Sequence, residues 1–313
     1  MPWNLKGKIE VNIVFILNIY VSSFIIRNML HSKYCVQEID SNKQGPVLKK
    51  IKHYQIDRLR SIFNKLSATK ESQQIAKAAL LEKLLIANKD SPELLSYTLF
   101  KISSNIVADC QEEFFNETDE SHPLKLARVS CGLCVEINTL KDTVKAQFYH
   151  TCPMTIPRNA MEGLTGDSFY ENMRFRGKPS ENGITIWETK DDWLARMSKL
   201  LCTFSVMIIQ PEQTPFTLLD GWQWLSLVVN SIVSSNNIPF YSAMMLEVFL
   251  RVTANVLFKQ YGELFMLLLK TIQLQVIPLL GVNMHRKEGL EEFLSRFINS
   301  HGNDFMSLFQ KAQ

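Results

Sequence analysis

Apolar residues recur every three or four positions along most of this 313-residue chain, which is the spacing of one face of an α-helix. The pattern predicts helices over residues 47–66, 69–90, 92–115, 123–138, 139–152, 191–210, 221–233, 239–280 and 287–310. Short turns separate most of these segments, so neighbouring helices are expected to run antiparallel. The sequence therefore predicts an all-α fold, an α-solenoid of antiparallel helix pairs without a fixed sequence period.

Residues at the ends of these segments support the predicted helices. Ser91 precedes Pro92, and a capping side chain followed by a proline in the first turn starts many helices. Pro153 ends the helix predicted over 139–152, because proline cannot continue the backbone hydrogen bonding. These boundary signals are independent of the apolar spacing and agree with it.

Two regions fall outside the helical pattern. Residues 1–45 form an N-terminal extension that we leave unassigned, and residues 47–313 are predicted to form one helical domain. Within that domain, residues 153–190 contain several prolines and glycines and are predicted to form a long loop. A loop of this length inside a compact domain is usually functional or mobile. Its best candidate strand is the segment 183–188.

The N-terminal extension contains an apolar segment, residues 11–26, which follows Lys6 and Lys8 and precedes Arg27. The segment is shorter than the roughly 20 residues that span a bilayer. Three interpretations stay open: a buried or docking helix, a signal or anchor segment, and a start that is not used in the cell. Membrane contact by this segment is left uncertain. If the chain were secreted, Asn116 would be a glycosylation acceptor.

Composition restricts the classes of function. The net charge of +3 is too small to indicate nucleic-acid binding by bulk electrostatics. Basic residues interleaved with an aromatic platform are not visible either, so direct binding of nucleic acid is not expected. The six cysteines are scattered, which is typical of reduced thiols. Cys131 and Cys134 form a Cys-x-x-Cys pair inside a predicted helix without a βαβ unit, and we interpret them as core residues.

Recognisable catalytic patterns are missing from the sequence. The chain lacks a glycine-rich phosphate loop, a Gly-x-Ser-x-Gly nucleophile elbow and a His-Glu-x-x-His zinc motif. Its six histidines are dispersed singly, so no metal site is predicted. The sequence therefore favours a helical binding scaffold over an enzyme, and no resident cofactor is predicted.

Five motifs occur in an order that resembles the C-terminal domain of the GLE-one family, the RNA export mediators of the nuclear pore. They are the Cys-Pro elbow at 152–157, the helix start from Pro123 to Arg128, Arg196-Met197-Ser198, Gly221-Trp222-x-Trp224-Leu225, and the helix from Phe249 to Tyr261. The resemblance covers about residues 47–300. It adds a specific family to the helical scaffold that the apolar pattern predicts.

The resemblance implies an all-α fold akin to HEAT repeats and a function without chemistry of its own. Family members bind a DEAD-box RNA helicase on the cytoplasmic face of the nuclear pore complex and speed its ATPase cycle. A nucleoporin caps the C-terminal helices in the family, and translation initiation or termination factors are further partners to consider. The implied location is the nuclear pore, in exchange with the nucleus and the cytoplasm.

Inositol hexakisphosphate bridges the two proteins in several family members, where a Lys-Lys pair directly before the Cys-Pro elbow grips the phosphates. Here these two positions are His150 and Thr151. Histidine carries charge only when protonated, and threonine never does. Lys49, Lys101 and His150 are the residual candidates for contact with the polyphosphate. We expect weak or absent binding of inositol phosphate, with helicase binding retained.

Two alternatives to helicase activation stay open. The first is a helical scaffold of the same fold that binds another protein partner without activating a helicase. The second is an enzyme or a secreted protein directed by residues 1–26. Stimulation of a helicase ATPase would separate the first alternative from the family function, and the location of the chain in the cell would separate the second.

Overall fold

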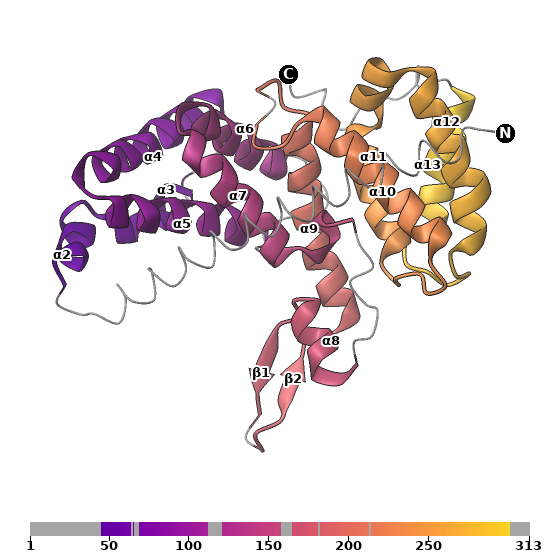
Figure 1. Ribbon diagram of the computed structural model, residues 1–313, viewed down its shortest axis with the longest axis horizontal. Helices are drawn as coiled ribbons and strands as arrows, with labels where there is room; N and C mark the ends of the chain where they lie inside the picture. Colours follow the sequence, from indigo (N-terminus) through magenta and orange to yellow (C-terminus); the bar gives the residue numbers. More distant parts are fainter. Residues whose placement is uncertain are drawn as a thin grey trace. The chain divides into compact units, whose positions relative to one another are not determined.

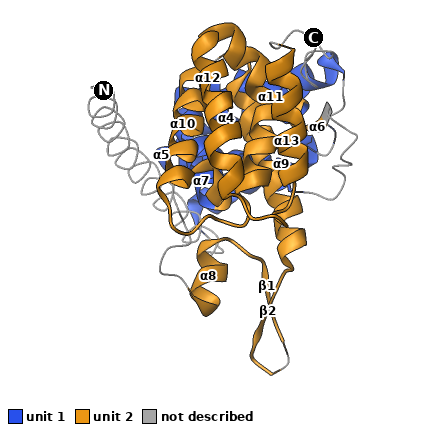
Figure 2. Cartoon of the chain, turned by 90° about the vertical axis from the view of Figure 1, so that its right-hand side faces the viewer, with its two compact units in different colours: residues 1–112, 125–150 blue, residues 113–124, 151–313 orange. Residues whose placement is uncertain are grey.

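The computed structural model describes residues 45–63, 65, 69–111, 121–157, 165–180, 182–212 and 214–300. Within these residues the fold is all-α apart from one short β-hairpin, as the sequence predicted. The chain divides into two compact units (Figure 2). The first comprises residues 1–112 and 125–150, and the second residues 113–124 and 151–313.

The first unit consists of helices. Its elements are α2 (Pro46–His53), the 3-10 turn η1 (Ile56–Arg58), α3 (Arg60–Phe63), α4 (Lys70–Asp90), α5 (Pro92–Asp109), most of α6 (Ser121–Glu136) and α7 (Asn138–Thr151). Helices α4 and α5 form an antiparallel pair that turns at Ser91 (Figure 1). The Ser91 hydroxyl accepts a hydrogen bond of 3.2 Å from the backbone N–H of Leu94, which confirms the predicted helix start.

The helix predicted over residues 47–66 is interrupted. Gln55 adopts a left-handed conformation with φ of 56°, and this residue separates α2 from η1. Ile51 and Ile56 are five positions apart, which places them about 140° apart around a continuous helix. The interruption brings both side chains, together with Leu59, into the core, where each is 1% exposed.

The core of the first unit is made of aliphatic side chains from its longer helices. Fully buried members are Leu80 and Leu84 of α4, Ile102 and Ile106 of α5, Leu126 and Leu133 of α6, and Leu140 and Val144 of α7. Cys131 and Cys134 are buried on α6 as free thiols, which confirms their interpretation as core residues. Lys77 of α4 pairs with Glu136 of α6 at 3.3 Å outside this core.

The second unit is arranged around one buried helix. Its elements are η2 (Pro153–Thr155), α8 (Gly166–Asn172), β1 (Gly177–Pro179), β2 (Thr185–Trp187), α9 (Lys190–Ile208), α10 (Leu218–Ser234), α11 (Ser242–Tyr261), α12 (Glu263–Thr271), the π-helical turn η3 (Ile272–Val276), the 3-10 turn η4 (Ile277–Leu279) and α13 (Lys287–Asn299). Helix α11 packs against α9, α10, α12 and α13. Most of its residues are buried, as expected for a helix surrounded by others.

The helix predicted over residues 239–280 is also divided. Gly262 has φ of 53° and separates α11 from α12, a conformation that residues with a side chain rarely adopt. The helical geometry then changes to a π turn and a 3-10 turn before Leu280 becomes extended. The apolar spacing alone could not show these changes, because core-facing residues occur on both sides of each break.

The stretch predicted as a long loop, residues 153–190, contains ordered elements as well as irregular chain. Strands β1 and β2 pair antiparallel, with Lys178 opposite Ile186, and helix α8 precedes them (Figure 1). Strand β2 lies within residues 183–188, which confirms that segment as the best candidate strand. Short strands of this kind give little periodic signal, so the hairpin was not predicted as a whole.

Two further observations bear on membranes and metals. The apolar segment 11–26 lies outside the described residues, and the structure therefore does not bear on its three interpretations. Among the helices that the structure describes, none has both the length and the hydropathy to cross a bilayer. In the same part of the chain, His, Cys, Asp and Glu side chains form no group of three or more that could hold a metal ion.

Candidate functional site

The Cys-Pro elbow at 152–157 is a buried corner of the second unit. Cys152 and Met154 are almost completely buried, and Pro153 begins the 3-10 turn η2 directly after α7. The indole Nε1–H of Trp224 donates a hydrogen bond of 3.0 Å to the backbone carbonyl of Met154. The elbow is therefore held by α10, through a bond between residues far apart in the sequence.

Three of the sequence motifs meet at Trp224. Its ring lies 4.3 Å from the ring of Phe249 of α11 and 6.2 Å from that of Phe204 of α9, measured between centroids. Met154, Trp224 and Phe249 belong to three different motifs, and all three are buried. This part of the motif pattern therefore reflects packing of the core.

Arg196 fixes the base of the hairpin. Its guanidinium donates hydrogen bonds to both carboxylate oxygens of Glu188 and one of 2.7 Å to the backbone carbonyl of Arg174. The side chains of Arg196 and Glu188 are only 7% and 12% exposed. A buried pair whose members make several hydrogen bonds defines one geometry for the segment it holds.

The thiol of Cys152 in the elbow stays protonated at neutral pH. Burial raises the pKa of Cys152 to about 12, although backbone hydrogen bonds and the charge of Arg196 act in the opposite direction. Burial likewise raises the pKa of Cys134 to about 12. Both thiols are protonated at neutral pH, and a protonated thiol is a poor nucleophile and metal ligand. The Cys152 thiol is therefore not available as a nucleophile at neutral pH.

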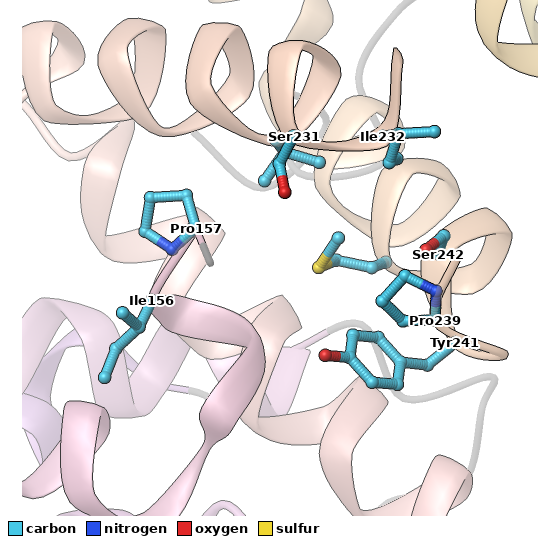
Figure 3. Close-up of a pocket in the computed structure, with 9 residues that line it drawn as sticks. Ile156, Pro157, Ser231, Ile232, Pro239, Tyr241 and Ser242 are labelled. Atoms are coloured by element: carbon cyan, nitrogen blue, oxygen red, sulfur yellow. The ribbon is translucent and has the colours of Figure 1, made fainter. Parts of the chain in front are cut away.

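A small pocket lies beside the elbow (Figure 3). It is lined by Ile156, Pro157, Val228, Ser231, Ile232, Pro239, Tyr241, Ser242 and Met245. The Ser242 hydroxyl is fully buried and makes no hydrogen bond within the described part of the chain. Charged side chains are absent from this lining, so the pocket does not suit a phosphate group.

The three residues predicted to contact a polyphosphate all belong to the first unit. Lys49 is exposed on α2, and Lys101 is half-buried on α5. The Lys101 ammonium lies 5.1 Å from the centroid of the Tyr97 ring, one turn earlier on the same helix. His150 is half-buried in the last turn of α7. Helices α2 and α7 lie at opposite ends of this unit in Figure 1.

The distance between these positions bears on whether they can share one polyphosphate. Several cations must converge on one such ligand. The structure places Lys49 on a helix distant from the one that carries His150. The C-terminus of a helix also carries partial negative charge, which opposes an anion next to His150 and Thr151. Lys49 and His150 are thus carried by two separate helices of the first unit.

Two exposed apolar surfaces were missed in the sequence. Leu264 and Leu267 of α12 and Leu274 of η3 are between 62% and 72% exposed, within the run whose apolar spacing predicted a helix over residues 239–280. Ile184 and Ile186 of the hairpin are also exposed. Apolar spacing shows that residues share a face but not whether another helix covers that face, so only the structure could separate these residues from the core.

Both the sequence and the fold of this chain are similar to those of known proteins. A family model described as GLE1-like protein matches residues 31–273. The mRNA export factor GLE1 of Mus musculus is 23% identical over 230 residues, and that of Rattus norvegicus is 24% identical over 197 residues. These matches cover 71% and 60% of this chain but 31% and 27% of the two relatives. The chain thus spans less than a third of the length of these relatives.

Solved structures give the same picture at the level of the fold. A chain in the structure of the S. cerevisiae Dbp5 C-terminal domain bound to Gle1 and IP6 is similar to this chain, with a TM-score of 0.69 and 17% identity. The match covers 90% of this chain and 96% of that one. A second structure of the same assembly, with a Gle1 variant, gives a TM-score of 0.68. The predicted all-α, HEAT-like fold is confirmed by this likeness.

Proposed function

The chain belongs to the GLE1-like protein family, and from this premise we propose that it is an mRNA export factor that binds and activates a DEAD-box RNA helicase at the cytoplasmic side of the nuclear pore. The observation that carries the proposal is the family match over residues 31–273, on a fold shared with a structure in which Gle1 and the Dbp5 C-terminal domain are bound. Location in both nucleus and cytoplasm follows from this role.

The proposed activation works through binding alone. A bound protein shifts a conformational equilibrium only by as much as its affinity differs between the two states. A preference of about 1.4 kcal/mol for one state changes the ratio of the states tenfold. Helices fixed by buried contacts, such as the bond between Trp224 and the elbow, keep a defined surface that can prefer the helicase form with separated lobes. The protonated buried thiols agree with a role without chemistry.

Inositol hexakisphosphate is not required in this proposal. Support comes from the separation of Lys49 from His150 and from the uncharged Thr151 at the end of α7. We expect calorimetry with inositol hexakisphosphate at physiological salt to show binding weaker than micromolar. Replacement of His150 and Thr151 by lysine together should strengthen it, because two cations then stand before the elbow. Micromolar or tighter affinity of the unchanged chain would overturn this part of the proposal.

A nucleoporin is the second proposed partner. The exposed leucines Leu264, Leu267 and Leu274 form an apolar surface on α12 and η3 in the C-terminal part of the second unit. Exposed apolar surfaces of this kind mark sites of protein association more often than chance. Translation initiation and termination factors are further candidates, although no feature of the described residues distinguishes them.

The proposal is tested by binding and by location. A complex of this chain with the DEAD-box helicase of the same organism should form in a pull-down with purified proteins. A tagged chain should label the nuclear rim. Absence of the complex would contradict the proposal, as would secretion of the chain or glycosylation at Asn116, which lies outside the described residues.

A further inference from the structure

Helix α13 ends beside the start of α12 (Figure 1). Directly before α13, the guanidinium of Arg286 lies 3.7 Å from the carboxylate of Glu247 on α11. Near the end of α13, the ring of Phe297 lies 6.0 Å from that of Phe258 of α11 and 6.2 Å from that of Phe265 of α12, measured between centroids. Helix α13 therefore runs in the same direction as α11, and the chain leaves it at the corner between α11 and α12.

A row of exposed leucines begins at this corner. Leu264, the residue before Phe265, is 65% exposed, and Leu267, one turn further along α12, is 62% exposed. Leu274 of η3 is 72% exposed. At the rise of a helix, the distance from Leu264 to Leu274 is about 15 Å. Large aliphatic side chains exposed in such a row are typical of a surface that another segment covers.

The chain that continues from α13 carries a matching apolar pattern. Its large apolar residues fall at the spacing of one helix face: Phe305, Met306, Leu308 and Phe309. They belong to residues 301–313, which lie outside the described residues. A short helix is marginal in water by itself and gains most of its stability by packing an apolar face on another surface. The sequence of this segment therefore calls for an apolar surface within its reach.

The exposed leucines are within reach of this segment. Ser300, the last described residue, is three positions after Phe297. The ring contact between Phe297 and Phe265 places the end of α13 close to Leu264. Residues 301–313 would extend roughly 20 Å as a helix, which is enough to cover the row of leucines. A tethered segment meets its surface at an effective concentration in the millimolar range, so even a weak contact is populated.

We propose that residues 301–313 dock through Phe305 and Phe309 on the exposed leucines of α12 and η3 in the same chain. The docked segment shields this surface and competes with other partners for it. The apparent affinity of a partner that binds the same leucines, such as the proposed nucleoporin, is lowered by the fraction of chains in which the surface is free. The contact itself lies within one chain, so it can fail while the proposed function stands, and the reverse.

The experiment measures the accessibility of α12 in the full chain. Leu267→Cys places a thiol at the proposed contact, and Leu219→Cys on α10 is the matched control, since both leucines are exposed side chains of the same unit. Alkylation by iodoacetamide is followed at each cysteine by peptide mass spectrometry, with and without Phe305→Ser and Phe309→Ser. Cys152 is buried, so its lack of alkylation shows in every sample that the fold is intact.

With the native segment, alkylation at the Leu267 position is expected to be about tenfold slower than with Phe305→Ser and Phe309→Ser. Alkylation at the Leu219 position is expected to change by less than about twofold. Equal rates at the Leu267 position with and without the two serines would overturn the proposal. The single substitutions take the place of the double one if Cys152 becomes reactive in it, and each should accelerate alkylation by a smaller factor.

A second copy of the chain is the alternative occupant, and dilution distinguishes it. Protection by the chain's own segment does not depend on protein concentration, because the segment is tethered to the surface that it covers. Protection by a second copy falls as the protein is diluted. A rate of alkylation at the Leu267 position that stays constant over a hundredfold dilution supports the proposal, and a rate that rises on dilution overturns it.

Discussion

At the scale of single residues, the second unit depends on a few buried polar groups with defined partners. Arg196 binds Glu188, and Trp224 binds the carbonyl of Met154. Both Arg196 and Trp224 stand in motifs that the sequence had marked. The motifs pointed to the family, but their role in holding the hairpin and the elbow needed the partners, which lie up to 70 residues away. No local pattern can show such a partner.

Arg196→Leu should lower the free energy of unfolding by about 3 kcal/mol or more, because the buried Glu188 carboxylate is left without its cation. Urea denaturation followed by circular dichroism measures the change. Arg296→Leu is the control, since the pair of Arg296 with Glu292 is exposed and should contribute less than about 1 kcal/mol. Equal losses of unfolding free energy in the two variants would show that the buried pair stabilises the fold no more than the exposed pair does.

Stability should fall at alkaline pH through Cys152. Its pKa is raised from 9.0 to about 12 in the folded chain. The folded state therefore holds the proton more tightly, and the associated stability is complete below the unfolded pKa and is lost as pH rises from 9.0 through about 12. Between these values Cys152→Ala should lose stability less steeply than wild type, by up to about 1.4 kcal/mol per pH unit. Urea denaturation of both proteins across this pH range, with neutral pH as reference, measures the difference. If the stability of wild type and of Cys152→Ala falls in parallel with pH, the prediction is contradicted.

At the scale of elements, helix boundaries were predictable where a specific residue marks them. Ser91 with Pro92 and Pro153 mark boundaries that the structure confirms. Gln55 could not be predicted as a break, because its left-handed backbone has no signature in the residue type. Gly262 also breaks a helix, but the long apolar run around it favoured the prediction of one continuous helix. Local chemistry thus shows a boundary only when the residue itself imposes the backbone geometry.

Gly221 allows α10 to approach the end of α9. A Cβ atom at this position would lie 2.8 Å from Ile208 Cγ2, which is closer than real contacts. Gly221→Ala should therefore lower the free energy of unfolding by about 1–3 kcal/mol. Adding Ile208→Leu, which moves the branch away from Cβ, should recover part of the loss.

The control for this prediction is Gly281→Ala, because nothing lies within 4 Å of a Cβ atom there. Its effect on stability, measured by the same urea denaturation, should stay within about 0.5 kcal/mol. A Gly221→Ala variant as stable as wild type would show that α10 and α9 can separate at no cost.

At the scale of the whole molecule, the sequence was sufficient for the fold class and the family and insufficient for the surfaces. Helical spacing and motif order depend on residues that face the core, and the core determines the fold. The exposed isoleucines of the hairpin carry the same apolar character as core residues. Whether Ile184 is covered depends on elements far away in the chain. The exposed apolar surfaces therefore became visible only in the three-dimensional structure.

The most direct measurement is the RNA-stimulated ATPase rate of the DEAD-box helicase from the same organism, with and without saturating amounts of this chain and without inositol hexakisphosphate. The account predicts a several-fold rise in rate and no ATP hydrolysis by the chain alone. An unchanged rate, while the two proteins demonstrably bind, would contradict activation and favour a scaffold of the same fold that serves another partner.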